Sequence, residues 1–238
     1  DLDILLVPIG GGGLIGGIAT IARDMRPDIK IIGVQTALYP AMKQAVAGQD
    51  IACGGETLAE GIAVKKPGAV TQPVVAKYVD DVLLVDEQAL EWAVGALVEQ
   101  QRVVSEGAGA AGIAAIYQHR EIFAGKKVGV VICGGNIDPR LLASILNRNM
   151  ASDGRLARLR IDISDEPGML AAITASISRC GGNIVEIYHQ RLFYDVPAKL
   201  AKIDAVIETR GPDHVTEIID ELRGANFQVR QMDDYSGS

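Results

Sequence analysis

The stretch Val7-Pro8-Ile9-Gly10-Gly11-Gly12-Gly13-Leu14-Ile15-Gly16-Gly17 decides how the first part of the chain folds. The apolar run 4–7 before it is too short for a helix and predicts a buried strand, whereas the run 18–22 after it predicts a helix. Because glycines carry no β-carbon, successive backbone N–H groups can turn toward one point, where the helix N-terminus adds about half a positive charge. The stretch therefore predicts a strand, a glycine loop and a helix that together bind a phosphate group.

Two other interpretations of these glycines exist. They could serve only to let a helix pack closely against a strand. Gly11, Gly13 and Gly16 also match the dinucleotide fingerprint, which expects an acidic residue at the end of the next strand. That strand is predicted at 30–34 and is followed by Gln35, so the second half of the fingerprint is missing.

The composition limits the classes of function. The chain has 238 residues, of which 48% are hydrophobic, enough for one large or two modest domains. The net charge of −7 leaves no basic footprint for nucleic acid, and no apolar run approaches membrane-spanning length. Three scattered cysteines suit the reduced thiols of a cytoplasmic protein, and three histidines without ligand-like spacing indicate no transition-metal site. We therefore expect a cytoplasmic protein with neither nucleic-acid nor membrane partners.

Strands and helices alternate from residue 1 to about 148. Further strands are predicted at 82–85 and 128–132, and helices at 41–47 and at 87–101, the latter with Asp86 as its N-cap. This alternation is typical of a parallel α/β sheet covered on both faces.

Four motifs carry a resemblance to a known family. They are Gly10 to Gly13 with Leu14, Thr57-Leu58-Ala59-Glu60-Gly61, Ser105-Glu106-Gly107-Ala108-Gly109-Ala110, and Cys133-Gly134-Gly135-Asn136-Ile137-Asp138. In this order they resemble the threonine and serine dehydratases, which are fold-type II pyridoxal-phosphate enzymes. The resemblance covers residues 1–148 and implies part of a three-layer fold-type II catalytic domain with pyridoxal 5'-phosphate as cofactor.

The resemblance also implies roles for individual residues. Gly10, Gly11, Gly12, Gly13 and Leu14 would cradle the cofactor phosphate. Cys133 stands where the family presents a serine or cysteine to the pyridine nitrogen. A thiol there leaves the ring largely unprotonated and a weaker electron sink, which elimination of a β-hydroxyl tolerates because the leaving group departs with the α-proton. Alternatively, Cys133 is a small buried hydrophobe at a strand end.

Two acidic residues are further candidates. In the related serine racemases, acidic residues in the regions of Glu60 and Glu106 lie near the cofactor or a divalent cation. Either residue could instead cap a helix or face solvent. We take Glu106 as a cofactor-site candidate and leave a cation near Glu60 open.

The catalytic lysine of the family is absent from this sequence. In the family it lies in a Ser-x-Lys-x-Arg-Gly type motif upstream of the glycine loop, and no lysine here has that setting. Since a pyridoxal enzyme needs this lysine, we expect the chain to be the C-terminal part of a longer dehydratase and to be inactive toward threonine by itself.

The character of the sequence changes after residue 148. Residues 149–157 predict a polar linker. A strand at 159–163, a helix at 167–179, strands at 183–192 and 201–209 joined by a turn region containing Pro197, a helix at 213–223 and a strand at 227–230 follow. This βαββαβ order is the ferredoxin-like unit.

Residues 158–238 are similar to the ACT domain, a regulatory module that binds amino acids. The resemblance rests on Asp165-Glu166-Pro167-Gly168-Met169-Leu170 and on Gly182-Asn183-Ile184. It implies an effector site in which Asp165, Pro167 and Gly168 meet Asn183 and Ile184 of a partner domain, and hence at least a dimer. The alternative is that Asp165 to Gly168 only begin a helix.

Together the two resemblances imply an allosteric threonine dehydratase. It would deaminate L-threonine to 2-oxobutanoate and ammonia, with serine as a second substrate. The expected effector is isoleucine or valine. A serine racemase or another fold-type II lyase, and a non-catalytic amino-acid sensor, remain alternatives.

Overall fold

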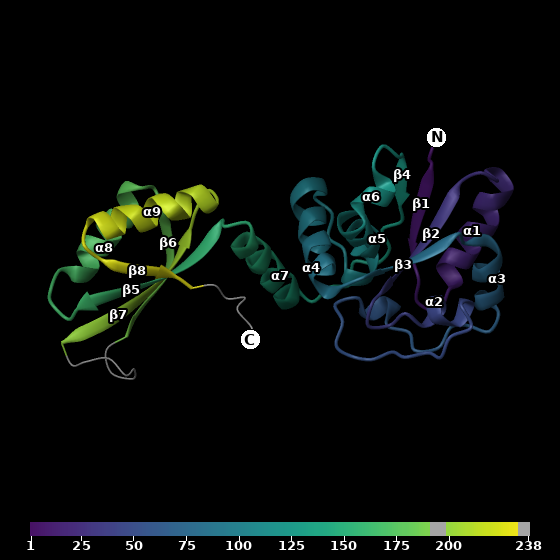
Figure 1. Cartoon of the computed structure of the whole chain (residues 1–238), viewed down its shortest axis with the longest axis horizontal. Helices are drawn as coiled ribbons and strands as arrows, with labels where there is room; N and C mark the ends of the chain where they lie inside the picture. Colours follow the sequence, from purple (N-terminus) through teal and green to yellow (C-terminus); the bar gives the residue numbers. More distant parts are fainter. Residues whose placement is uncertain (191–198, 233–238) are drawn as a thin grey trace. The chain divides into compact units, whose positions relative to one another are not determined.

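The chain forms two compact units in the computed structural model, which describes residues 1–190 and 199–232. The units divide between Ile145 and Leu146, and Figure 1 labels the elements of each. The predicted turn around Pro197 and the last two residues of the predicted strand 183–192 lie outside the described residues.

The first unit is built on a parallel four-stranded sheet in the order β3-β2-β1-β4. Its strands are β1 (Ile4–Pro8), β2 (Lys30–Thr36), β3 (Asp81–Val85) and β4 (Val128–Val130). Its helices are α1 (Gly13–Met25), α2 (Ala41–Val46), η1 (Glu60–Ile62), α3 (Thr71–Tyr78), α4 (Glu87–Ala96), η2 (Leu97–Gln101), α5 (Gly107–Gln118) and α6 (Arg120–Phe123).

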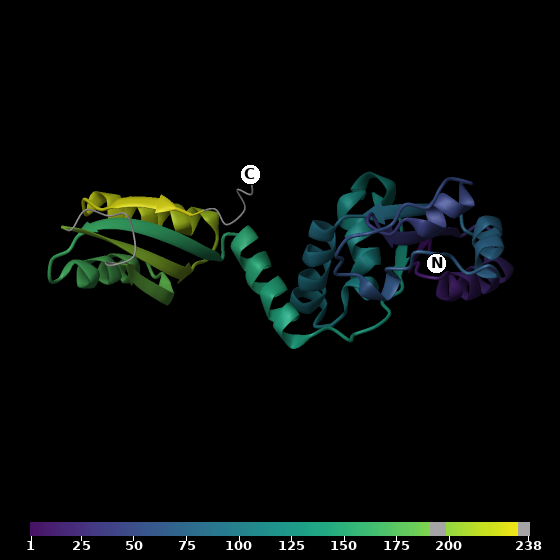
Figure 2. The same cartoon turned by 90° about the horizontal axis from the view of Figure 1, so that it is seen from below.

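Alternate residues of the strands serve two separate cores. Ile4 and Leu6 of β1 pack with α4 and α5, whereas Val7 packs with α1 and α3. Figure 1 shows α4 and α5 on one side of the sheet and α1 and α3 on the other, and Figure 2 shows α4 and α5 side by side. This confirms the predicted parallel, three-layer α/β architecture.

Several predicted boundaries were wrong, each for a local reason. The strand predicted at 128–132 ends at Val130, although the backbone N–H of Val131 still donates to the carbonyl of Leu6 in β1 at 3.0 Å. The helix predicted at 87–101 is α-helical only to Ala96 and continues as the π-helical turn η2, and Asp86 caps it by accepting from the backbone N–H of Ala89 at 2.8 Å. The helix α3 was not predicted, because it buries only Val75 and so lacks an apolar stripe.

The second unit has the predicted βαββαβ order in an antiparallel sheet, β6-β7-β5-β8. Its elements are β5 (Leu156–Ser164), α8 (Met169–Arg179), β6 (Asn183–Gln190), β7 (Leu200–Glu208), α9 (Pro212–Gly224) and β8 (Gln228–Gln231). The helix predicted from residue 167 begins only at Met169, because Gly168 has φ 95°, outside the helical region. One face of the sheet packs against α8 and α9 in a single apolar core, which includes Leu159, Ile203 and Ile218.

The helix α7 (Pro139–Ser152) joins the two units in sequence. It runs through the first residues of the predicted linker 149–157, and β5 begins inside that linker at Leu156. Because the ends of α7 and β5 do not test where the domains divide, the domain limits 1–148 and 158–238 stay predictions. Among the described residues, no helix is both long and apolar enough to cross a membrane.

Candidate functional site

The glycine loop lies between β1 and α1, as predicted. Gly12 is the N-cap of α1 with φ 91° and ψ 0°, a left-handed conformation that favours glycine. A β-carbon at Gly12 would lie 2.6 Å from Cε of Met42 and 2.8 Å from Oγ1 of Thr71. This position therefore requires glycine for both its backbone angle and its surroundings.

The carbonyl of Gly11 is held from outside the loop. It accepts hydrogen bonds from the hydroxyl of Thr71 at 2.5 Å and from the backbone N–H of Gly68 at 3.2 Å. Within residues 1–190 and 199–232, the backbone N–H groups from Gly10 to Leu14 donate to no protein acceptor. Since α1 starts here, these donors and the helix dipole together favour an anionic ligand.

The loop forms one wall of a cavity of about 290 Å³. Residues from four parts of the first unit line it: Pro8, Gly10, Gly11, Gly12, Gly13, Leu14, Gly61, Ile62, Glu106, Ala108, Cys133 and Gly134. All seven residues expected at the cofactor site (the four glycines, Leu14, Glu106 and Cys133) line this one cavity. Their roles there remain predictions.

Cys133 follows β4 and is half-buried. Burial, and secondly the nearby Glu106 carboxylate, raise the pKa of the Cys133 thiol. The side chain therefore stays a protonated S–H at neutral pH, a weak donor rather than a nucleophilic thiolate.

Glu106 is the N-cap residue of α5, but its side chain makes no capping hydrogen bond. Its Oε1 lies 2.1 Å from where a β-carbon of Gly134 would be and 3.2 Å from that of Gly61. The carboxylate thus lies between these two glycines in the wall of the cavity. The side chain of Glu106 does not cap α5, contrary to the alternative interpretation.

Glu60 lies elsewhere. It is exposed at the start of η1 and does not line the cavity. In the described part of the chain, no group of three or more His, Cys, Asp or Glu side chains could hold a metal ion. The loop that contains Glu60 is instead positioned by Glu87, whose carboxylate accepts from the Thr57 hydroxyl at 2.7 Å and from the backbone N–H of Leu58 at 2.7 Å.

Gln35, which interrupts the dinucleotide fingerprint, has an internal role. It is fully buried, and its amide group donates to the carbonyls of Ile9 at 3.4 Å and Tyr39 at 3.1 Å and accepts from the backbone N–H of Lys43 at 3.0 Å. All these partners are main-chain groups, one just before the glycine loop and two at the start of α2, so the Gln35 side chain links β2 to these two segments inside the protein.

Two positions that hold the site, Gly68 and Thr71, were missed from the sequence. They follow the loop by more than fifty residues and form no motif with it. Only the pairing of these two segments in the folded chain reveals their contact with Gly11.

Comparison with known proteins places this chain in a family. Residues 1–134 match the model of the pyridoxal-phosphate dependent enzymes. The chain belongs to this family. Among curated members, L-threonine ammonia-lyase of Thermotoga maritima is 39% identical over 232 residues, which are 97% of this chain and 58% of that enzyme. The L-threonine ammonia-lyase of Geobacter sulfurreducens is 38% identical over 96% of this chain and 58% of its own length.

Solved structures with a similar fold cover a little over three fifths of this chain. The processed form of threonine deaminase isoform 2 from Solanum lycopersicum superposes with a TM-score of 0.57 at 28% identity, over 62% of this chain and 44% of its own. Maize serine racemase gives a TM-score of 0.55 at 32% identity, over 63% of this chain and 48% of its own. This chain is thus a homologue of threonine ammonia-lyases that spans little more than half the length of its curated relatives.

The residues expected at an effector site lie apart within one chain. The backbone N–H of Asp165 donates to the carbonyl of Lys199 at 3.0 Å, next to the start of β7. Asn183 pairs with Glu208 at the other end of β7, and its side chain donates to that carboxylate at 3.0 Å. A single copy therefore does not bring the two halves of the predicted effector site together; a site made of both would need a second copy.

Proposed function

We propose that this chain is part of a pyridoxal-phosphate-dependent threonine ammonia-lyase, which converts L-threonine, and also L-serine, to the corresponding 2-oxo acid and ammonia. The observation that carries the proposal is the single cavity that joins the glycine loop, Glu106 and Cys133 in a member of this family. Relatives that match both units at 39% and 38% identity are L-threonine ammonia-lyases.

The residues present fit the cofactor. The N–H groups from Gly10 to Leu14 would bind the phosphoryl group, and the space that β-carbons at Gly11 and Gly13 would enter is open. The protonated Cys133 thiol would face the ring nitrogen of the cofactor and would leave this nitrogen largely unprotonated. The cofactor, when bound, supplies the electron-accepting ring that lets the α-proton of the amino acid leave.

The proton-transferring lysine would come from outside this chain. Among the described residues that line the cavity, none is a lysine. We therefore propose that residues 1–238 bind the phosphate and contact the pyridine ring of the cofactor but do not catalyse the reaction by themselves. Borohydride treatment with pyridoxal phosphate and peptide mapping should show no stoichiometric adduct on one lysine; such an adduct would contradict this.

A chimera tests the reaction itself. This chain would replace the matching part of the Thermotoga maritima enzyme, whose remaining part completes the protein. The expected product from L-threonine is 2-oxobutanoate, with ammonia in equal amount. Formation of D-serine from L-serine without 2-oxo acid would favour the serine racemase alternative, for which the similarity to maize serine racemase is the supporting observation. No reaction from a folded chimera that binds the cofactor would favour the non-catalytic sensor.

We further propose that the second unit is an ACT regulatory domain, in which Asp165, Pro167 and Gly168 of one copy and Asn183 and Ile184 of another bind isoleucine or valine. The βαββαβ order and the separation of these residues along β7 support a shared site. An effector must bind two states of the dimer unequally to regulate it. Isoleucine should shift the chimera's threonine saturation curve, and Asp165→Asn should remove the shift; an unchanged curve with isoleucine would contradict regulation.

A further inference from the structure

The peptide that joins Gly11 to Gly12 has a defined direction. Its carbonyl oxygen lies 2.5 Å from the Thr71 hydroxyl and 3.2 Å from the backbone nitrogen of Gly68, two groups outside the glycine loop. In a trans peptide, which this one is, the N–H points opposite to the carbonyl. The N–H of Gly12 therefore points away from Thr71 and Gly68.

The cavity at the glycine loop lies on the other side of this peptide. Gly11 and Gly12 line the cavity, whereas neither Gly68 nor Thr71 does. In the part of the chain that the structure describes, the Gly12 N–H donates to no protein acceptor. This N–H is therefore available to an anion in the cavity.

The backbone of the loop does not fix this direction by itself. A peptide reverses when ψ of the residue before it and φ of the residue after it both change, and here both residues are glycines. A β-carbon at Gly11 would meet no atom within 4 Å, so the surroundings on that side do not oppose a reversal. A reversed peptide would turn the Gly11 carbonyl oxygen toward the cavity, where it would repel an anion. Groups outside the loop must therefore select the direction.

Thr71 and the N–H of Gly68 are the groups that select it. In the reversed peptide the Gly68 N–H would lose its acceptor, and the Thr71 hydroxyl, which donates to the Gly11 carbonyl, would have to accept instead. The hydroxyl also lies 3.1 Å from the Gly68 carbonyl, but the nearer Gly11 carbonyl is the better acceptor for its single proton. The observed direction is thus the one in which both donors are paired.

Thr71 is held in place by the packing of α3. It is the first residue of this helix, and Val75, one turn later, is buried in the same apolar core as Ile15 of α1. The side chain of Gln72 donates to the carbonyl of Ala45 in α2 at 3.1 Å. Since α3 is fixed against both α1 and α2, the Thr71 hydroxyl stays opposite the glycine loop.

We propose that Thr71 is a positioning residue that makes the glycine loop selective for a phosphorylated cofactor. By donating to the Gly11 carbonyl, it keeps the Gly12 N–H directed at the phosphoryl oxygens and keeps the carbonyl oxygen away from them. Thr71 does not line the cavity and acts only through the loop. The inference rests on the proposed function, because it takes the loop as the phosphate site of a pyridoxal-phosphate enzyme.

The test compares the binding of pyridoxine 5'-phosphate and of pyridoxine to residues 1–238 by titration calorimetry. Neither compound has an aldehyde, so surface lysines do not trap them. We expect the unaltered chain to prefer the phosphate ester. Thr71→Val, which replaces the hydroxyl by a methyl group, should lower this preference about fivefold, as expected for one lost hydrogen bond. Thr71→Ser, which keeps the hydroxyl, should restore the preference.

Thr20→Val is the matched control. It also removes a hydroxyl that donates to a backbone carbonyl, that of Gly16 at 2.8 Å within α1, and it should leave the preference unchanged.

The outcomes separate this inference from the proposed function. An unchanged preference in a folded Thr71→Val chain, or a loss that Thr71→Ser does not restore, would overturn the role of Thr71 and leave the phosphate site intact. Equal binding of the two compounds by the unaltered chain would contradict the proposed function, and this inference with it.

A second measurement needs no variant and so does not depend on the folding of Thr71→Val. NMR titration of isotope-labelled residues 1–238 with inorganic phosphate should move the amide proton signal of Gly12 downfield, as expected when an N–H donates to an anion. Shifts at Gly13 and Leu14 with none at Gly12 would show that the Gly12 N–H does not face the anion, and would overturn the proposal.

Discussion

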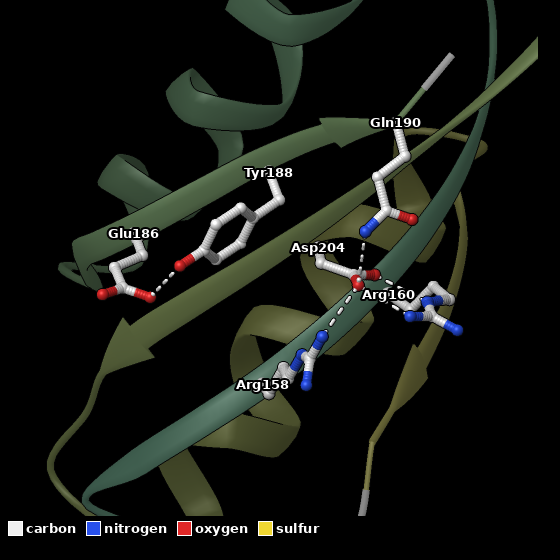
Figure 3. A network of polar contacts seen from close by, with 6 residues as sticks. All are labelled: Arg158, Arg160, Glu186, Tyr188, Gln190 and Asp204. Carbon is white, nitrogen blue, oxygen red and sulfur yellow. Dashed lines mark hydrogen bonds and ion pairs between the residues drawn. The ribbon is translucent and has the colours of Figure 1, made fainter. Parts of the chain in front are cut away.

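Two cavities among the described residues are built from different parts of the polypeptide: one of about 290 Å³ at the glycine loop of the first unit, and one of about 360 Å³ on the sheet of the second unit. The cavity of the first unit presents main-chain N–H groups of the glycine loop, and its shape depends on missing β-carbons. The cavity of the second unit presents side-chain charges, Arg158 and Glu186, that meet only through the register of three strands (Figure 3).

The difference determines how each site fails. A main-chain site is disturbed by added atoms that move the backbone, whereas a charged side-chain site is disturbed when one member of a buried cluster is removed. Substitutions in the two units should therefore have effects of different origin, and the following predictions compare them.

The largest effect is expected at Asp204. Replacing it by alanine leaves Arg158 and Arg160 without their shared carboxylate and should lower the free energy of unfolding of the second unit by about 4 kcal/mol. Urea denaturation followed by circular dichroism measures this. Asp220→Asn, which removes an exposed carboxylate 3.9 Å from Arg223, is the control and should change stability by less than about 1 kcal/mol.

Acid should reproduce part of this loss. Because the Asp204 pKa is lowered in the folded state, the group contributes stability above its unfolded pKa of about 3.9 and loses it as the pH falls toward the folded value. Asp204→Asn should flatten this acid dependence. An equally steep loss in the variant would show that other carboxylates cause it.

The next effect is expected at Gly109 in the first unit. A β-carbon there would lie 2.2 Å from the Cys133 carbonyl oxygen and 2.4 Å from Oγ of Ser105, so Gly109→Ala must move the backbone beside the cavity. We expect a loss of about 3 kcal/mol in thermal or urea unfolding. Gly17→Ala, whose β-carbon meets no atom within 4 Å, is the control and should be neutral or slightly stabilising.

A smaller effect is expected at Glu87. Glu87→Gln removes the negative charge that both bonds use: the amide oxygen can still accept from the Leu58 N–H, but the amide nitrogen must then donate to the Thr57 hydroxyl, which can no longer donate to this side chain. The first unit should lose about 1.5 kcal/mol, measured by urea unfolding. Glu121→Gln on the exposed surface of α6 should have no measurable effect, and equal losses in both variants would contradict a positioning role for Glu87.

The smallest effect concerns Cys133. Since the Glu106 carboxylate contributes to its raised pKa, Glu106→Gln should lower that pKa and speed alkylation of Cys133 by iodoacetamide at pH 8 about twofold. Alkylation of Cys53, which Glu106 does not influence, is the internal control. Mass spectrometry of the peptides gives both rates, and an unchanged rate at Cys133 would place Glu106 too far away to act.

The sequence allowed the glycine loop, the alternation of strands and helices in the first unit and the βαββαβ order of the second unit to be predicted, because each depends on neighbours in the chain. Gly10 to Gly13 follow an apolar run directly, and the βαββαβ order follows from local periodicity. The cavity lining of Glu106 and Cys133 could be expected only from the family resemblance, since nothing local to either residue indicates the other.

The sheet cavity could not be predicted, and the reason is the β-bulge in β6. Regular alternation from Ile184 would place Glu186 and Tyr188 in the core, on the wrong face. The extra residue shifts both to the face of Arg158, and no turn or glycine in the sequence marks it. The contact of Thr71 with Gly11 is hidden for a similar reason, because it depends on the pairing of distant loops.

Binding of pyridoxal 5'-phosphate to residues 1–238, compared with pyridoxal, tests the central claim that the main-chain amides of the glycine loop hold a phosphoryl group. Fluorescence titration should show that the phosphate ester binds and that pyridoxal binds at least about tenfold more weakly. Gly12→Ala should abolish this difference, while Gly17→Ala keeps it. Equal affinity for the two compounds, or a difference that survives Gly12→Ala in a folded protein, would contradict the account.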